Sequence, residues 1–179
     1  MNVKRIVITG GPGTGKSSII SELTNRNYNC FEEISRQVTL KARDNGVDQL
    51  FLDKPLLFSE LLLEARLQQF NDASKEKAPI IFYDRGLPDV LAYMDYAKKD
   101  YPMHFKSICK SHRYDGIFIL PPWKEIYVSD NERYENFEQA QQIHKQLTKT
   151  YKHLNYTLIT VPFGNVKERT DFILKQIEH

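Results

Sequence analysis

ITGGPGTGKSSII, residues 8–20, overlaps the end of a short β-rich run, VKRIVIT at residues 3–9. The residues that follow the glycines keep helical spacing, with Ile19, Ile20 and Leu23 on one side. A β-branched run, a cluster of glycines and an amphipathic segment in this order predict a strand, a tight loop and a helix.

The loop also carries a phosphate-binding signature. Its residues match the P-loop (Walker A) pattern GxxxxGK[ST] without a mismatch. Glycines let backbone N–H groups curve around a phosphate, and the N-terminus of the next helix points its positive end at the same place. Lys16 is suited to the β- and γ-phosphates and Ser17 to Mg²⁺. We therefore expect the nucleotide phosphates to bind Gly10, Gly11, Pro12, Gly13, Thr14, Gly15, Lys16, Ser17 and Ser18.

Composition favours one globular domain over residues 1–179. The chain has 179 residues, of which 41% are hydrophobic and 27% charged, enough to bury a core without covalent staples. With 25 Lys and Arg against 23 Asp and Glu, the charge balance does not call for nucleic acid or an anionic membrane as partner. No segment resembles a membrane span or a signal peptide, and Cys30 and Cys109 lack metal spacing. These features predict a cytoplasmic protein with reduced thiols.

Strand-like and helical runs alternate along the chain. The strand-like runs lie at residues 3–9, about 28–32, 79–84, 116–121 and 156–161. Between them lie helical segments, the longest at 54–77 with apolar residues at 57, 58, 61, 62, 65 and 70. This order predicts an α/β fold with a parallel sheet and helices on both faces. Ligands of such sheets bind at the carboxyl ends of the strands.

Charged residues follow the second predicted strand. If a helix starts there, Glu33 and Arg36 share one of its faces. The carboxylate could then orient or deprotonate an acceptor hydroxyl, and the arginine could hold a phosphate or a substrate carboxylate. The alternative is that the acidic residues only complement the helix dipole.

The third predicted strand ends in Asp84, where a P-loop protein needs a carboxylate for Mg²⁺ opposite Ser17. Arg85 is placed to stabilise charge on the phosphoryl group in flight. Asp89 and Tyr93 lie four residues apart, so they share a helix face and together could grip a hydroxylated ring. Asp89 could equally be an ordinary acid of the first helical turn.

Two loops complete the predicted site. Residues 121–135 form an irregular segment in which Asp130 and Arg133 could close over the phosphates as a lid, or else remain solvated. The loop around Gly164 follows the fifth predicted strand and is expected to meet the nucleotide base. The N/T-K-x-D signature of guanine-selective GTPases is absent from the chain, which favours adenine.

Taken together, these segments resemble the AAA-type P-loop ATPase domain family that contains the ribosylnicotinamide-kinase domain of NadR proteins. The resemblance spans nearly the whole chain, and its most specific parts are the DRG-x-x-D-x-x-x-Y block and the block from PPW to D-x-x-R. The matching segments are GGPGTGKSS, EEISR, YDRGLPDVLAY, LPPWKEIYVSDNERY, HKQLTKTYKHLNY and TVPFGNVKERTDFIL.

The resemblance implies a nucleotide-kinase-like fold with three α/β/α layers and five parallel strands in the order 2-3-1-4-5. It also implies a cleft lined by Glu33, Arg36, Asp84, Arg85, Asp89, Tyr93, Asp130 and Arg133. Our leading hypothesis is a Mg²⁺-dependent kinase that transfers the γ-phosphoryl group of ATP to a nucleoside-like acceptor. In this kinase the catalytic residues would be Lys16, which binds the β- and γ-phosphates, Arg85 and Arg133, which offset the developing charge, and Glu33 or Asp84, which accepts the proton of the acceptor.

Two other functions use the same motifs. A nucleotide-dependent switch would close the segment 121–135 to expose a surface to a protein or lipid partner. A nucleic-acid-binding ATPase would need a basic stripe interleaved with exposed aromatic residues, and no such stripe is present in the sequence. The oligomeric state and the identity of the acceptor are left open by the sequence.

Overall fold

A five-stranded parallel sheet forms the centre of the molecule. The computed structural model describes residues 3–44, 54–127 and 136–177. The strands are β1 (Lys4–Gly10), β2 (Asn29–Phe31), β3 (Ile80–Asp84), β4 (Gly116–Leu120) and β5 (Leu158–Thr160). They pair in the order β2-β3-β1-β4-β5 with every pair parallel. The predicted strand order is therefore confirmed.

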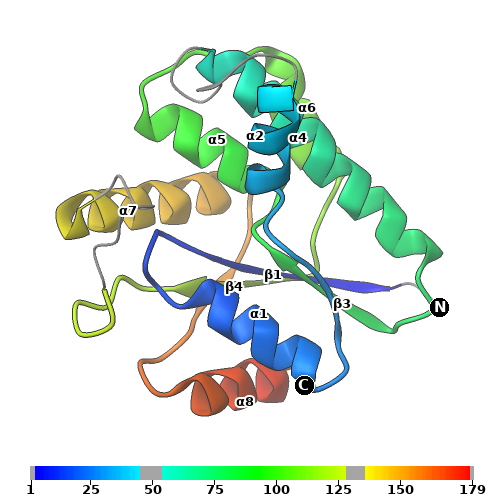
Figure 1. Ribbon diagram of the computed structural model, residues 1–179, viewed down its shortest axis with the longest axis vertical. Coiled ribbons are helices and arrows are strands. Elements are labelled where there is room, and N and C mark those ends of the chain that lie inside the picture. Colours follow the sequence, from blue (N-terminus) through cyan, green and yellow to red (C-terminus); the bar gives the residue numbers. More distant parts are fainter. Residues whose placement is uncertain (1–2, 45–53, 128–135, 178–179) are drawn as a thin grey trace.

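Helices cover both faces of this sheet (Figure 1). One face carries α1 (Lys16–Asn25) and α8 (Val166–Ile177). The other face carries α2 (Ser35–Asp44), α4 (Pro55–Asp72), α5 (Leu87–Tyr96), α6 (Met103–Ser111) and α7 (Phe137–His153), and a short 3₁₀ turn, η1 (Ala73–Lys75), ends α4. This arrangement is the three-layer α/β/α fold that the sequence predicts.

Alternating strand residues build one core on each side of the sheet. In β1, Val7 packs into the core beneath α4 to α7, whereas Ile6 and Ile8 pack into the core beneath α1 and α8. Both cores consist mainly of aliphatic and aromatic side chains that are almost completely buried. A sheet buried on both faces explains why its central strands are nearly continuous apolar runs.

The side of helix α4 that is buried in the core differs from the side predicted from its apolar residues. Its buried residues are Ser59, Leu62, Leu63 and Arg66. Leu57 and Leu61, counted in the expected apolar face, are 39% and 36% exposed. The buried face is therefore rotated toward two polar residues, and one of them is an arginine.

Strand register brings the loops at the carboxyl edge together. Ile8 of β1 pairs with Asp84 of β3, and Phe31 of β2 pairs with Tyr83. The P-loop after β1, the turn after β3 and the segment after β2 therefore leave the sheet side by side. None of the described helices has the length and apolar character needed to cross a bilayer.

Candidate active site

The P-loop has a positive φ at three glycines, Gly10, Gly13 and Gly15. Gly10 has φ 154° and a Cβ there would lie 2.7 Å from the carbonyl oxygen of Leu120. Gly15 has φ 86°, and its Cβ would lie 2.8 Å from Nη1 of Arg169. Gly10 is therefore favoured both by its φ and by the backbone atom beside it, whereas Gly15 is favoured mainly by its φ, because its neighbour is the end of a flexible side chain.

Lys16 begins α1 and points into the loop. Its side chain is only 8% exposed, and Nζ donates a hydrogen bond of 2.8 Å to the Gly11 carbonyl. Burial, together with the charge of Arg85, lowers the pKa of Lys16 to about 7, although Asp84 and Glu33 act in the opposite direction. In such a buried site, an anion beside Nζ strongly stabilises the charged form of the lysine, and a nucleotide phosphate supplies that anion.

Asp84, the last residue of β3, is buried with one free oxygen. Burial raises the pKa of Asp84 above its ordinary value, against the opposing charges of Lys16 and Arg85. Oδ1 has no hydrogen-bond partner among the described residues. An unpartnered buried carboxylate oxygen fits a metal ion or its bound water. Ser17 is exposed on the first turn of α1, so its hydroxyl is accessible to a Mg²⁺ ion that nucleotide phosphates also bind.

No cluster of three or more metal-binding His, Cys, Asp or Glu side chains occurs in the part of the chain that the structure describes. A Mg²⁺ ion that is bound through one or two protein groups and substrate phosphates needs no such cluster. Ser17 and Asp84 therefore fit the predicted metal role.

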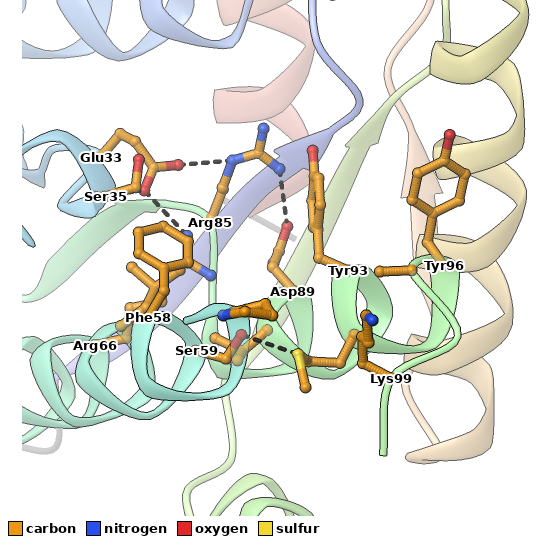
Figure 2. A pocket seen from close by; sticks show the side chains of 15 residues that line it. Glu33, Ser35, Phe58, Ser59, Arg66, Arg85, Asp89, Tyr93, Tyr96 and Lys99 are labelled. Atoms are coloured by element: carbon orange, nitrogen blue, oxygen red, sulfur yellow. Dashed lines mark hydrogen bonds and ion pairs between the residues drawn. The ribbon is translucent and has the colours of Figure 1, made fainter. Parts of the chain in front are cut away.

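Arg85 contacts the P-loop and also lines a neighbouring cavity. Figure 2 shows its side chain among the others of that cavity. Nε forms an ion pair of 2.6 Å with Oε2 of Glu33, and Nη1 donates to the carbonyl of Gly10 at 3.2 Å. The guanidinium also lies 5.1 Å from the ring centroid of Tyr93. Its backbone φ of 74° is uncommon for a residue other than glycine, and such strained positions cluster at functional sites.

Glu33 is held by two arginines rather than by a helix. Its Oε1 accepts hydrogen bonds from Arg66 Nη2 at 3.0 Å and from the Ser35 backbone N–H at 3.1 Å. Burial by itself would raise the pKa of Glu33, but the charges of Arg66 and Arg85 outweigh burial and lower it to about 2.

The expected pairing of Glu33 and Arg36 on one helix face does not form. Helix α2 begins at Ser35, so Glu33 precedes the helix and Arg36 lies within it. Arg36 is exposed and is not among the residues that line the cavity beside Arg85. Its predicted contact with a substrate phosphate or carboxylate stays a prediction.

The cavity beside Arg85 has a volume of about 540 Å³ and lies mainly between α4 and α5 (Figure 2). Charged groups border it at one end, and aromatic and aliphatic side chains form most of its walls. The charged end consists of Glu33, Arg66, Arg85 and Asp89, and the walls include Phe58, Leu62, Val90, Tyr93 and Met94. This combination suits a flat apolar ring that carries a polar group directed at Arg85.

Asp89 borders the cavity, but its carboxylate is bound within the protein. It is completely buried, and Oδ1 accepts from the Thr9 hydroxyl at 2.6 Å. Oδ2 accepts from the Gly86 N–H at 2.9 Å and from the Tyr151 hydroxyl at 2.6 Å. Of the two expectations for Asp89, the first-turn acid is what the structure shows, and a grip on substrate together with Tyr93 stays a prediction.

Several residues of the site escaped the sequence analysis. Arg169 of α8 donates to the carbonyl of Thr14 at 2.9 Å and lies 5.9 Å from the ring of Trp123. Trp123 stacks on Phe163 with ring centroids 5.0 Å apart, next to Gly164 in the loop after β5. Arg66 and Tyr151 were also missed. They make their contacts across 33 and 62 residues of sequence, respectively, so no local pattern reports them.

The predicted lid lies partly outside the described residues. The structure describes residues 121–127, while Asp130 and Arg133 lie outside the described residues. Their roles as substrate-binding and catalytic residues stay predictions, as does the contact of Gly164 with a base.

A model of the AAA domain family matches residues 5–169. The chain belongs to this family. The match to the AAA domain runs from β1 into α8 and so includes every described residue of the site discussed above. A search of curated protein sequences finds no significant match.

Solved structures share the fold of this AAA domain at low sequence identity. Deoxyadenosine kinase from M. mycoides is 18% identical with a TM-score of 0.69, covering 97% of this chain and 98% of that one. NadR protein in complex with NR is 17% identical with a TM-score of 0.75, covering 98% of this chain and 51% of that one. NadR in complex with NAD and AMP-PNP is 15% identical with a TM-score of 0.70, covering 98% and 49%. The chain thus spans about half the length of the NadR chains, and these likenesses show a common fold.

Proposed function

We propose that this protein is an ATP-dependent kinase that transfers the γ-phosphoryl group to a hydroxyl of a nucleoside-like acceptor. The observation that carries the proposal is the position of Arg85, which contacts the P-loop carbonyl of Gly10 and borders the cavity of about 540 Å³. A phosphate in the loop and a hydroxyl at the charged end of the cavity would meet at this guanidinium. The fold shared with deoxyadenosine kinase and with NadR protein in complex with NR supports it.

Each part of the phosphoryl transfer can be assigned to side chains and backbone groups of the site. The acceptor oxygen forms a bond to the γ-phosphorus while the bond to the β–γ bridging oxygen breaks and ADP leaves. Lys16 and the loop N–H groups hold the β- and γ-phosphates, and Arg85 stabilises charge on the transferring group. The hydroxyl proton passes to Glu33 or Asp84. Mg²⁺ bound through Ser17 and Asp84 would supply charge neutralisation on the phosphates.

An aromatic surface near the P-loop suits the base of ATP. Trp123 and Phe163 stack on each other, and Arg169 joins this pair to the P-loop through its bond to Thr14. Aromatic rings bind a nucleobase by stacking, and stacking does not discriminate between bases. The preference for adenine therefore rests only on the absence of the guanine signature from the sequence.

Mass spectrometry of a reaction with Mg·ATP and a pool of nucleosides, including ribosylnicotinamide, tests the proposal. We expect one nucleoside to gain a single phosphoryl group and the Lys16→Ala variant to give no product. Lys175→Ala, an exposed lysine on α8, is the matched control and should retain the product. If ATP binds tightly but no nucleoside is phosphorylated, the proposal is wrong and a nucleotide-dependent switch replaces it.

Binding of ATP should take up nearly one proton at about pH 8. The pKa of Lys16 is about 7 in the free protein, and a phosphate beside Nζ raises it by favouring the ammonium form. The affinity for ATP is therefore highest below the pKa of the free lysine and falls as the pH rises through it. Calorimetry in two buffers of different ionisation enthalpy measures the uptake. Lys16→Met should abolish it, and equal heats in the two buffers for the native protein would contradict the assignment.

A further inference from the structure

Arg66 is a buried cation in the middle of helix α4. Its side chain is only 3% exposed. Nη1 donates a hydrogen bond of 3.1 Å to the carbonyl oxygen of Gly86, and Nη2 donates one of 3.0 Å to Oε1 of Glu33. Arg66 therefore joins three segments that are far apart in the sequence: α4, the end of β2 and the turn between β3 and α5.

Stability alone is a poor reason for this arrangement. Removing a guanidinium from water is costly, and well-packed apolar side chains often replace buried ion pairs without loss of stability. The neighbours of Arg66 on the buried face of α4 include Leu62 and Leu63, so an apolar residue would continue that face. The position of the arginine is better explained by what it contacts than by the area it buries.

What Arg66 contacts is the group that holds Arg85. One carboxylate oxygen of Glu33 faces Arg66, and the other forms the 2.6 Å ion pair with Nε of Arg85 (Figure 2). The other polar contacts of Arg85 are longer, at 3.2 Å to Gly10 and 3.4 Å to Asp89. The carboxylate of Glu33 is thus the nearest polar partner of Arg85, and its other oxygen is held by Arg66 together with the backbone N–H of Ser35.

We propose that Arg66 is a positioning residue that fixes the Glu33 carboxylate and, through it, aims the Arg85 guanidinium at the point of phosphoryl transfer. The inference rests on the proposed kinase function, since it assigns Arg85 its task there. Arg66 itself would act without touching the transferring group. Its effect is expected on the rate of transfer and not on binding of ATP, because neither of its hydrogen bonds is made to a residue of the P-loop.

Kinetics of Arg66→Met and Arg66→Lys test the proposal. Methionine keeps most of the buried volume without charge, and we expect kcat to fall about 100-fold because small misplacement of a catalytic group has effects of this size. The KM for ATP should change by no more than about twofold. Lysine keeps the charge but not the planar fork that spans Gly86 and Glu33, so kcat should fall by about tenfold.

Gln69→Met is the matched control on the same helix. Gln69 donates to the carbonyl of Glu32 at 3.1 Å, so this change removes a tether between α4 and the same strand end without touching the carboxylate of Glu33. It should leave kcat unchanged. If Gln69→Met loses as much activity as Arg66→Met, or if Arg66→Met keeps the native kcat, Arg66 is only a structural tether and the proposal is wrong. If Arg66→Met does not fold, the lysine variant decides between these outcomes.

An NMR measurement separates this inference from the proposed function. The Nε–H of Arg85, ion-paired to Glu33, should give a slowly exchanging resonance in the native protein, assigned by its loss in Arg85→Gln. In Arg66→Met it should move toward the position of a free arginine and exchange faster. A native protein that phosphorylates no nucleoside would overturn the proposed function, whereas an unchanged Arg85 resonance in Arg66→Met would overturn the positioning role.

Discussion

Replacing Arg85 with glutamine should lower kcat about 1,000-fold, because removal of a donor that stabilises developing charge has effects of this order. Arg85 offers the only side-chain guanidinium among the described residues that borders the cavity and also hydrogen-bonds the P-loop backbone. Binding of ATP should weaken much less, since Lys16 and the loop N–H groups hold the phosphates. Initial rates with the identified acceptor and calorimetric ATP affinities measure the two effects separately.

Arg26→Gln provides the matched control for Arg85→Gln. Arg26, which directly follows α1, is also an arginine between two carboxylates, at 2.8 Å from Glu22 and 2.5 Å from Asp171, but it lies outside the cavity lining. The control removes the same charge and should leave kcat unchanged. A loss of less than tenfold in Arg85→Gln would show that Arg85 organises the site without acting on the transferring group.

The sequence predicts the parts of this molecule that depend on local patterns. The glycines and Lys16 mark the P-loop through fixed spacing, and the apolar runs that end in Thr9 and Asp84 mark two strands with their polar ends. The rule that ligands gather at the carboxyl edge of a parallel sheet then places Arg85 beside the P-loop. Each of these inferences needs only neighbours in sequence and one topological rule.

Other features depend on contacts that no local pattern contains. Arg66 has the spacing of a buried residue on α4, at four residues from Leu62, yet an arginine on an amphipathic helix is ordinarily assigned to solvent. Its burial follows from Glu33, which is 33 residues away in sequence. At the start of α2 the backbone N–H of Ser35 likewise donates to Glu33, which is held by arginines from α4 and from the turn after β3.

Asp89 shows how a strong motif leaves a role undecided. The sequence places it correctly on the first turn of α5 but leaves open whether it binds substrate or completes the helix. Thr9 and Tyr151 decide the observed geometry, because they supply donors from β1 and α7 that occupy both carboxylate oxygens. A variant at Asp89 therefore tests a structural role and a substrate-binding role against each other.

Asp89→Ala should lower the free energy of unfolding by about 4 kcal/mol. The change leaves the Gly86 N–H and the hydroxyls of Thr9 and Tyr151 without their buried acceptor, and each unsatisfied donor costs about 1–3 kcal/mol. Loss of the acid at the start of α5 contributes to the same total. Urea denaturation followed by Trp123 fluorescence and by circular dichroism measures the change.

Asp95→Ala on the same helix is the control, because Asp95 is exposed and accepts its hydrogen bonds from Tyr101 and Gln146 at the surface. It should lower the free energy of unfolding by no more than about 1 kcal/mol. Suppose instead that Asp89→Ala lowers the free energy of unfolding as little as Asp95→Ala does but raises the KM for the acceptor. The main role of Asp89 is then to bind the substrate, for which its carboxylate gives up its hydrogen bonds with Thr9 and Tyr151. A large loss of stability would instead show that Asp89 has a structural role. Its buried hydrogen bonds then link β1, α5 and α7 and hold the cavity wall on α5 against the strand that precedes the P-loop.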